Sequence, residues 1–270
     1  MDAWAGAPGG QVAKRGVRAG TRKARSRVRA RRGRAGPRVR VRRTRRGLAL
    51  EIDGTFASFY APGVARTGSV WDALVAPLLL LPRERRRKVL ILGLGGGSAA
   101  RLARALAPRA RIVGVELDAA VLRAARRWFG LDALAIEVVE ADALRYLERS
   151  RERFDLVIDD VFVGRGRRVR KPAWLPHPGL ALAARRVAAG GVLVSNAIDE
   201  AAAVARAQRA LFPNVLELRV EDYENRIVAG TRRAVTAAEL RGRIAADPVL
   251  GESLGALRIR TLGRMERDRH

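Results

Sequence analysis

The 270-residue sequence contains no cysteine and only two histidines, His177 and His270. Disulfide bonds and thiolate metal sites are therefore excluded, and two histidines cannot supply a histidine metal cluster. The longest apolar stretch, residues 73–81, has nine residues and includes Pro77. A membrane-spanning helix needs about 20 residues. We therefore expect a soluble, cytoplasmic protein with no metal site and no membrane partner.

Acidic residues are scarce at the N-terminus. The chain carries 54 Lys and Arg against 27 Asp and Glu, and residues 1–46 hold 17 of the basic residues with one acid, Asp2. A block of like charge without apolar periodicity is expected to be disordered. Three interpretations stay open: a solvated tail, a non-specific nucleic-acid or anionic-surface arm, or a wrongly assigned upstream start codon in a GC-rich gene. We also expect residues 263–270 to be frayed.

Residues 47–82 predict a small N-terminal unit. Two partly alternating runs, in LALEIDGTFASFY, flank Asp53-Gly54, which is typical of a β-hairpin. Residues 69–80 then predict a helix interrupted near Pro77. Such a unit can serve as a lid, as a homodimer contact, or simply as a cover for the sheet edge.

Residues 83–262 predict one domain of alternating strands and helices. Apolar runs predict strands at 89–92, 111–115, 135–139, 154–158 and 192–195. Helical patterns lie between them and after them, at 99–107, 119–129, 143–149, 178–188 and 198–211. Residues 215–220 and 226–229 predict two strands that form an antiparallel edge to a mostly parallel sheet. A last helix is expected to end at Ala246, with Thr236 and Glu239 as its capping box.

The first strand is followed by a glycine-rich turn, Gly93–Gly97, then a helix and a strand that ends on Glu116. This is the layout of a nucleotide-binding unit, in which helix-start amides and a carboxylate hold a nucleoside. An adenosine-type cofactor is therefore predicted. NAD is an alternative, because Glu116 lies 21 residues beyond Gly95, although Ser98 replaces the third glycine of the dinucleotide motif.

Five motifs occur in order along the chain: VLILGLGGGSAARL, VELD, EADALRYL, FDLVIDD and AAGGVLVSN. Together they resemble class I S-adenosylmethionine-dependent transferases, and specifically the spermidine synthase-like, or polyamine aminopropyltransferase, branch. The resemblance covers residues 48–230. It implies an α/β, Rossmann-like class I methyltransferase fold with a mostly parallel seven-stranded sheet and an antiparallel edge strand. The implied cofactor is S-adenosylmethionine or its decarboxylated form.

The resemblance also implies roles for single residues. The family's glycine loop lets the backbone approach the cofactor, and here it comprises Gly93, Gly95, Gly96 and Gly97. Glu116 corresponds to the acid that binds the ribose hydroxyls, and Asp142, beside Ala143, to the adenine contact. The structural alternatives are a tight turn, a solvated acid at a strand end and a helix cap.

Asp159 is interpreted as the first acid of the family's D-S/T-S-D motif, with Asp160 in support. A carboxylate there can orient an amine, remove its proton and direct its lone pair at the carbon attached to sulfur. The transferred group is aminopropyl by family resemblance or methyl. The alternative is a pair of acids that end a strand at a solvent crevice.

The sequence departs from true aminopropyltransferases where that family handles polyamines. Gly96 replaces the acid of the GGGDGG loop, Trp71-Asp72-Ala73 replaces a tyrosine-histidine-glutamate contact, and Phe162 replaces the second catalytic acid. The missing loop acid favours methyl transfer.

The loop at 164–171, GRGRRVRK, places five cations where the family's active-site gate lies: Arg165, Arg167, Arg168, Arg170 and Lys171. We therefore predict a small-molecule acceptor that can be anionic, unless the loop is a solvated surface. Trp174 either covers the substrate or packs, and His177 is interpreted as structural. A second, non-catalytic hypothesis is a nucleoside-binding protein that the basic tail tethers to nucleic acid.

Overall fold

The structure is a computed structural model that describes residues 38–263, apart from the side chain of Arg167. The predictions for residues 1–37 and 264–270 lie outside the described residues. The predicted tail is wrong for its last part, because strand β1 covers Val39–Thr44. The alternation of Val39 and Val41 with arginines places the valines against a small apolar core and the arginines toward solvent. An edge strand tolerates such charge.

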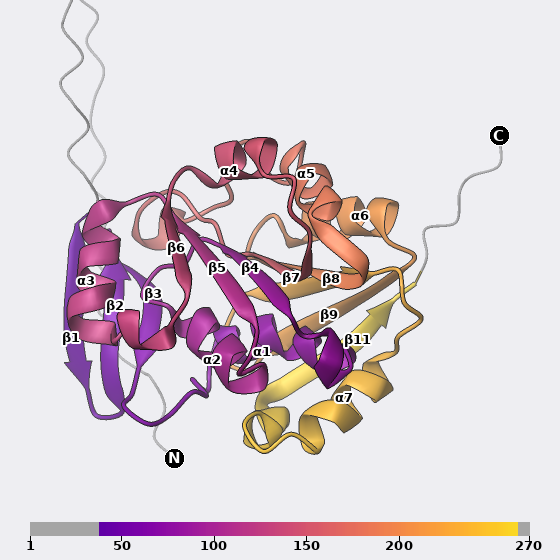
Figure 1. The fold of residues 1–270 in the computed structure, drawn as a ribbon, viewed down its shortest axis with the longest axis horizontal. Coiled ribbons are helices and arrows are strands. Elements are labelled where there is room, and N and C mark those ends of the chain that lie inside the picture. Colours follow the sequence, from indigo (N-terminus) through magenta and orange to yellow (C-terminus); the bar gives the residue numbers. More distant parts are fainter. Residues whose placement is uncertain (1–37, 264–270) are drawn as a thin grey trace, which may run out of the picture. The chain divides into compact units, whose positions relative to one another are not determined.

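Strand β1 belongs to a three-stranded antiparallel sheet with β2, Gly47–Ile52, and β3, Thr55–Tyr60. The predicted hairpin between β2 and β3 is confirmed: Asp53 and Gly54 have φ values of 51° and 79°. Figure 1 shows helix α3, Ala119–Phe129, alongside β1 and β2. Leu50 packs there against Val121 and Phe129.

The main sheet has eight strands in the order β11-β9-β10-β8-β7-β4-β5-β6 (Figure 1). Five are parallel: β4 Lys88–Leu92, β5 Arg111–Glu116, β6 Glu137–Glu140, β7 Phe154–Asp159 and β8 Val187–Ala197. The antiparallel end comprises β9 Asn214–Val220, β10 Arg226–Thr231 and β11 Leu257–Leu262.

The Rossmann-like α/β fold is confirmed, but with one strand more than the seven predicted. The extra strand is β11, which shows the two-residue period of a half-buried strand, with Leu257 and Ile259 buried and Arg258 and Arg260 exposed. The sheet therefore ends in three antiparallel strands.

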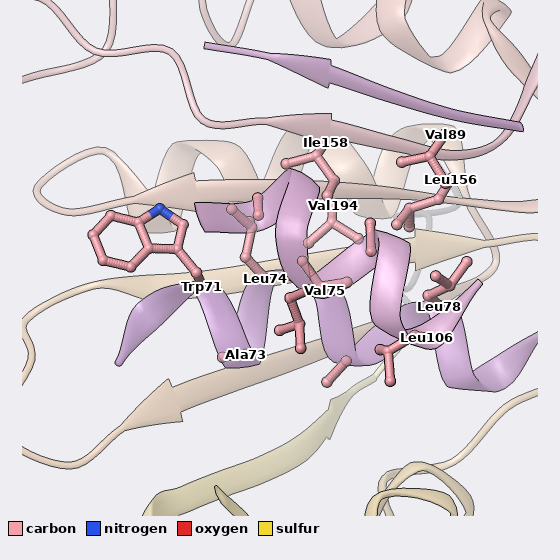
Figure 2. Packing of buried hydrophobic residues seen from close by; sticks show 14 of the residues in the cluster. Trp71, Ala73, Leu74, Val75, Leu78, Val89, Leu106, Leu156, Ile158 and Val194 are labelled. Atoms are coloured by element: carbon pink, nitrogen blue, oxygen red, sulfur yellow. The ribbon is translucent and has the colours of Figure 1, made fainter. Parts of the chain in front are cut away.

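Helices cover both faces of this sheet. On one face lie α1 Val70–Val75, α2 Ser98–Leu106 and α7 Ala237–Ala245, and on the other α4 Ala143–Arg149, α5 Gly179–Arg185 and α6 Ala201–Leu211 (Figure 1). The predicted interruption near Pro77 is confirmed, since a 3-10 helix, Ala76–Leu80, continues α1. Figure 2 shows Leu74 and Val75 of α1 beside Ile158 and Val194 of the sheet. In the part of the chain described, no helix has the length and apolarity needed to cross a bilayer.

Candidate functional site

A cavity of about 550 Å³ lies at the carboxyl ends of the parallel strands. Its walls come from the segments that follow β4, β5, β6 and β7, and from the β2–β3 hairpin and α1. In doubly wound sheets this edge is where ligands bind, because the loops there diverge to either side of the sheet. The volume is within the range of small-molecule sites.

Glu116, the last residue of β5, lines this cavity as predicted. Its Oε2 accepts a hydrogen bond from the Gly95 amide at 2.9 Å, and its Oε1 accepts from the amides of Leu117 and Asp118 at 2.9 and 3.2 Å. Burial raises the pKa of Glu116, and these three amides oppose the rise. The carboxylate thus ties the glycine turn to the end of β5 and retains lone pairs for a ligand hydroxyl.

Asp142 and Ala143 line the same cavity at the start of α4. The Oδ1 of Asp142 caps the helix by accepting from the Arg145 amide at 3.0 Å. Within the described residues, Oδ2 makes no hydrogen bond. The cap and the adenine contact are therefore compatible roles for one side chain, and the sequence-based assignment of Asp142 and Ala143 as ligand contacts stays a prediction.

The four glycines of the turn are close-packed, but against the protein's own atoms. A Cβ on Gly93 would lie 2.5 Å from the carbonyl oxygen of Asp160, and Gly93 has a φ of 83°. On Gly96 it would lie 2.8 Å from the Cβ of Ser58, and on Gly97 2.9 Å from a methyl group of Leu131.

Gly93 and Gly95 line the cavity, whereas Gly96 and Gly97 are absent from the described residues that line it. Only the first two glycines therefore offer backbone to a ligand there.

The two acids at the end of β7 have different environments. Asp159 is 1% exposed and does not line the cavity; its Oδ1 accepts from Lys171 Nζ at 2.8 Å and from the Val161 amide at 3.2 Å. Asp160 lines the cavity. Since successive side chains at a strand end point to opposite sides, Asp160 faces the cavity and Asp159 lies behind it, whereas the sequence analysis gives Asp159 the leading role. The catalytic assignment of the two acids stays a prediction.

Two donors fix the carboxylate of Asp160. Asn196 Nδ2 donates to its Oδ1 at 2.8 Å, and Trp71 Nε1 donates to its Oδ2 at 3.2 Å. Burial raises the pKa of Asp160 to about 6, against the opposing effects of these hydrogen bonds and of the Lys171 charge. The group is thus ionised at neutral pH but protonates within a range that activity measurements can reach.

The basic loop after β7 does not place five cations at the mouth. Lys171 is 3% exposed, is paired with Asp159 and donates a second hydrogen bond to the Val161 carbonyl at 3.0 Å. Arg165 Nε lies 3.4 Å from Asp53 Oδ2. The loop contributes apolar or backbone atoms to the wall, from Val161, Phe162, Val163, Gly164 and Val169.

Sequence reasoning missed several residues of the wall. Asn196 of β8 lies between Asp160 and Asn225, whose Nδ2 donates to the Asn196 Oδ1 at 2.8 Å. Phe56 of β3 packs edge-on against Trp71, with ring centroids 5.1 Å apart. Tyr223 also lines the cavity. Trp174, for which the sequence analysis leaves a substrate cover or packing open, lies in the same wall, whereas His177 does not belong to the described lining. The sequence indicates Asn196 only through the polar Ser195-Asn196 pair, which follows the apolar run of β8 near its carboxyl end.

Comparison with known proteins agrees with the fold described above. Residues 89–169 match a family model described as a methyltransferase domain. A probable spermidine synthase from Corynebacterium glutamicum superposes with a TM-score of 0.66 at 20% identity, over 85% of this chain and 91% of that one. The chain has the S-adenosylmethionine-dependent methyltransferase fold.

Two further proteins similar to this methyltransferase-fold chain have the word methyltransferase in their names. Human methyltransferase-like protein 13, solved in complex with SAH, superposes with a TM-score of 0.58 at 24% identity, over 74% of this chain and 96% of that one. An eEF1A lysine and N-terminal methyltransferase homolog from Drosophila pseudoobscura pseudoobscura is 30% identical over 172 residues, which are 59% of this chain. This chain spans about a quarter of that relative's length, 25%.

Proposed function

We propose that the chain is an S-adenosylmethionine-dependent methyltransferase whose acceptor is an amine, with Asp160 as the residue that positions the amine and takes its proton. The observation that carries the proposal is the charge of the cavity wall. Among the described residues it contains five carboxylates, Asp53, Glu116, Asp118, Asp142 and Asp160, and no lysine, arginine or histidine. Asp53 is paired with Arg165 outside the wall, and the other four carboxylates have no cation within salt-bridge distance in the described chain. Such a wall attracts a cation and repels the anionic acceptor that the loop sequence had favoured.

The cofactor end of the cavity is the part walled by Glu116 and Asp142. S-adenosylmethionine supplies an electrophilic methyl group on a sulfonium centre. Glu116 is placed to accept hydrogen bonds from ribose hydroxyls, and Asp142 has one carboxylate oxygen without a partner in the described chain. Gly93 and Gly95 line the cavity of about 550 Å³ with backbone and no side chain, which leaves room for a nucleoside.

The acceptor end is built around Asp160. Because its pKa of about 6 leaves it ionised at neutral pH, it attracts an ammonium group and accepts a proton from it. The freed nitrogen lone pair forms the N–C bond while the S–C bond breaks. Phe56, Trp71 and Trp174 provide aromatic walls that favour a cation over water. The hydrogen bonds from Trp71 and Asn196 hold the carboxylate in one orientation.

Methyl rather than aminopropyl transfer is supported by the surroundings of Gly96. The aminopropyltransferase resemblance assigns an amine-binding acid to this position, but the space beside Gly96 is filled by Ser58, whose Oγ accepts the Gly96 amide hydrogen at 2.7 Å. Asp72, which stands where that family binds polyamine, is buried under hydrogen bonds from Thr67, Gly68 and Ser253. Aminopropyl transfer is the second candidate, favoured by the likeness to the probable spermidine synthase.

The test measures binding and turnover separately. Calorimetry with S-adenosylmethionine, its decarboxylated form and NAD identifies the cofactor, and we expect S-adenosylmethionine to bind most tightly. Transfer of a tritiated methyl group is then assayed on lysine-containing peptides, free peptide N-termini, putrescine and spermidine. Asp160→Asn should retain cofactor binding and lose at least a hundredfold in kcat, about the contribution of one general base. The exposed Glu148→Gln serves as the matched control.

Three results would reject the proposal. Tightest binding of NAD would remove the transferase class, transfer of an aminopropyl group alone would select the second candidate, and full turnover by Asp160→Asn would remove Asp160 from the chemistry. Cofactor binding without transfer to any amine would favour the non-catalytic hypothesis.

A further inference from the structure

A second hollow, separate from the cavity above, lies between the edge strand β1 and helix α3. It is an open groove of about 620 Å³ walled by residues of both elements and of β2: Val39, Val41, Arg43, Leu48, Ala120, Arg123, Ala124, Arg127 and Trp128. The α3 residues recur at spacings of three and four, so they form one stripe along the helix. The small apolar core under β1 accounts for Ala124, which packs against it, but neither that core nor the proposed transfer reaction accounts for the arginines and the tryptophan of this stripe.

The charge of the groove has one sign. Its three charged residues, Arg43, Arg123 and Arg127, are exposed, and none has a carboxylate within salt-bridge distance in the described part of the chain. By contrast Arg126, on the neighbouring face of α3, lies 3.3 Å from Asp132. Three unpaired guanidinium groups around one hollow are complementary to a ligand with repeated negative charges.

The groove also contains an exposed aromatic surface. Trp128 is 43% exposed, although an indole of this size is normally buried in a core. The Arg127 guanidinium carbon lies 5.1 Å from the centre of its ring. An indole flanked by cations offers a base a stacking surface and offers its phosphate an ion pair, a combination that single-stranded nucleic acid uses and an acidic peptide does not need.

We propose that the groove between β1 and α3 binds single-stranded nucleic acid, with a base stacked on Trp128 and phosphates on Arg43, Arg123 and Arg127. The chain's own first 37 residues do not fit this groove by charge, because they contain eleven Lys and Arg against the single acid Asp2. The proposal concerns the folded domain, and it is independent of the basic tail and of the transfer reaction.

The experiment uses the full chain and a fluorescein-labelled 15-nucleotide oligouridylate, titrated by fluorescence anisotropy across a series of NaCl concentrations. Arg123→Gln/Arg127→Gln is compared with Arg149→Gln/Arg185→Gln, which removes two exposed arginines from α4 and α5 and so changes the net charge equally. The groove variant should lower the slope of log affinity against log salt by about 1.4, since each phosphate contact contributes about 0.7 for a single strand. The control variant should keep the wild-type slope.

Trp128→Ser tests stacking separately. It should weaken binding roughly tenfold without changing the salt slope, because a stacked base contributes affinity but no released counterion. An unchanged circular dichroism spectrum and thermal unfolding midpoint in each variant show that the domain remains folded.

Equal slopes for the two double variants would overturn the proposal. The proposal would also be overturned by two results together: polyglutamate competes as effectively as unlabelled oligouridylate, and Trp128→Ser binds the oligonucleotide with wild-type affinity. The groove would then fit an acidic protein. A dimer that Trp128→Ser converts to a monomer would make the groove an interface between copies of this chain.

Discussion

The buried pair of Lys171 and Asp159 should set the pH range in which Asp160 is active. Lys171 Nζ lies 2.8 Å from Asp159 Oδ1, and both side chains are almost completely buried, at 0% and 1% exposure. The Lys171 charge lowers the pKa of Asp160, and the Asp159 charge raises it by less. Lys171→Met and Asp159→Asn should therefore shift the acid limb of kcat/KM in opposite directions from a wild-type midpoint near pH 6.

The expected size of the shift follows from the loss of one nearby charge, on the order of one pKa unit. For Lys171→Met the midpoint rises, so the ionised fraction of Asp160 at pH 7 falls from about nine tenths to about one half. For Asp159→Asn the midpoint falls, because the Asp159 charge that raises the Asp160 pKa is lost. The assay is methyl transfer at saturating and subsaturating acceptor between pH 5 and pH 9, with cofactor binding followed in parallel.

Stability needs its own control, because removal of one partner from a buried ion pair costs about 3–5 kcal/mol. The double variant Asp159→Asn/Lys171→Met removes both charges, so its thermal unfolding and its midpoint should both return toward the wild-type values. A midpoint that stays at its wild-type position in both single variants, or that moves the same way in both, would refute this electrostatic coupling to Asp160.

Three further predictions concern the fold that holds the site. Glu217→Gln should lower stability at pH 7. Burial acts to raise the Glu217 pKa, but the hydrogen bonds and charges of two arginines lower it overall. The stabilisation by Glu217 is therefore present above the unfolded pKa, and acid-unfolding curves should show its loss as the pH falls through the folded pKa. Gly93→Ala should destabilise by about 2 kcal/mol and weaken cofactor binding, whereas Gly242→Ala, with open space around its Cβ position in α7, should stabilise by up to about 1 kcal/mol in chemical denaturation. Asp72→Ala removes the acceptor of four donors, three of them buried, and should cost about 3 kcal/mol in thermal unfolding. A loss under about 1 kcal/mol would contradict that assignment.

The motifs in the first half of the main domain are readable from the sequence because each combines a local signal with a fixed position in the fold. A buried strand is followed by a glycine turn, and the next strand ends on Glu116. Few folds other than a βαβ unit of a parallel sheet fit this order. The helix predicted at residues 143–149 has those bounds in the structure, since the side chain of Asp142 caps its first turn. Local chemistry and tertiary position agree at these sites.

Where the structure differs from the expectation, a long-range contact decides the outcome. Strand β1 was assigned to the tail because its arginines dominate the composition, and only pairing with β2 selects its valines as a buried face. The order of Asp159 and Asp160 depends on which side of the strand faces the cavity, a one-residue choice that a pair of adjacent acids does not encode. Likewise the sequence predicts Lys171 to be a surface cation, because the adjacent residues give no sign of its buried partner, Asp159, twelve residues earlier.

The glycine turn alone does not determine which group the proposed reaction transfers. The small N-terminal sheet, far from the motif in sequence, places Ser58 against Gly96 and so decides whether that loop position can carry a carboxylate. A Gly96→Asp substitution alone would collide with Ser58, whereas in a Ser58→Gly background the added acid gains room but the turn loses the hydrogen bond that its amide makes. The proposed preference for methyl transfer therefore rests on the contact between the N-terminal sheet and the glycine turn, where Ser58 of β3 occupies the space beside Gly96.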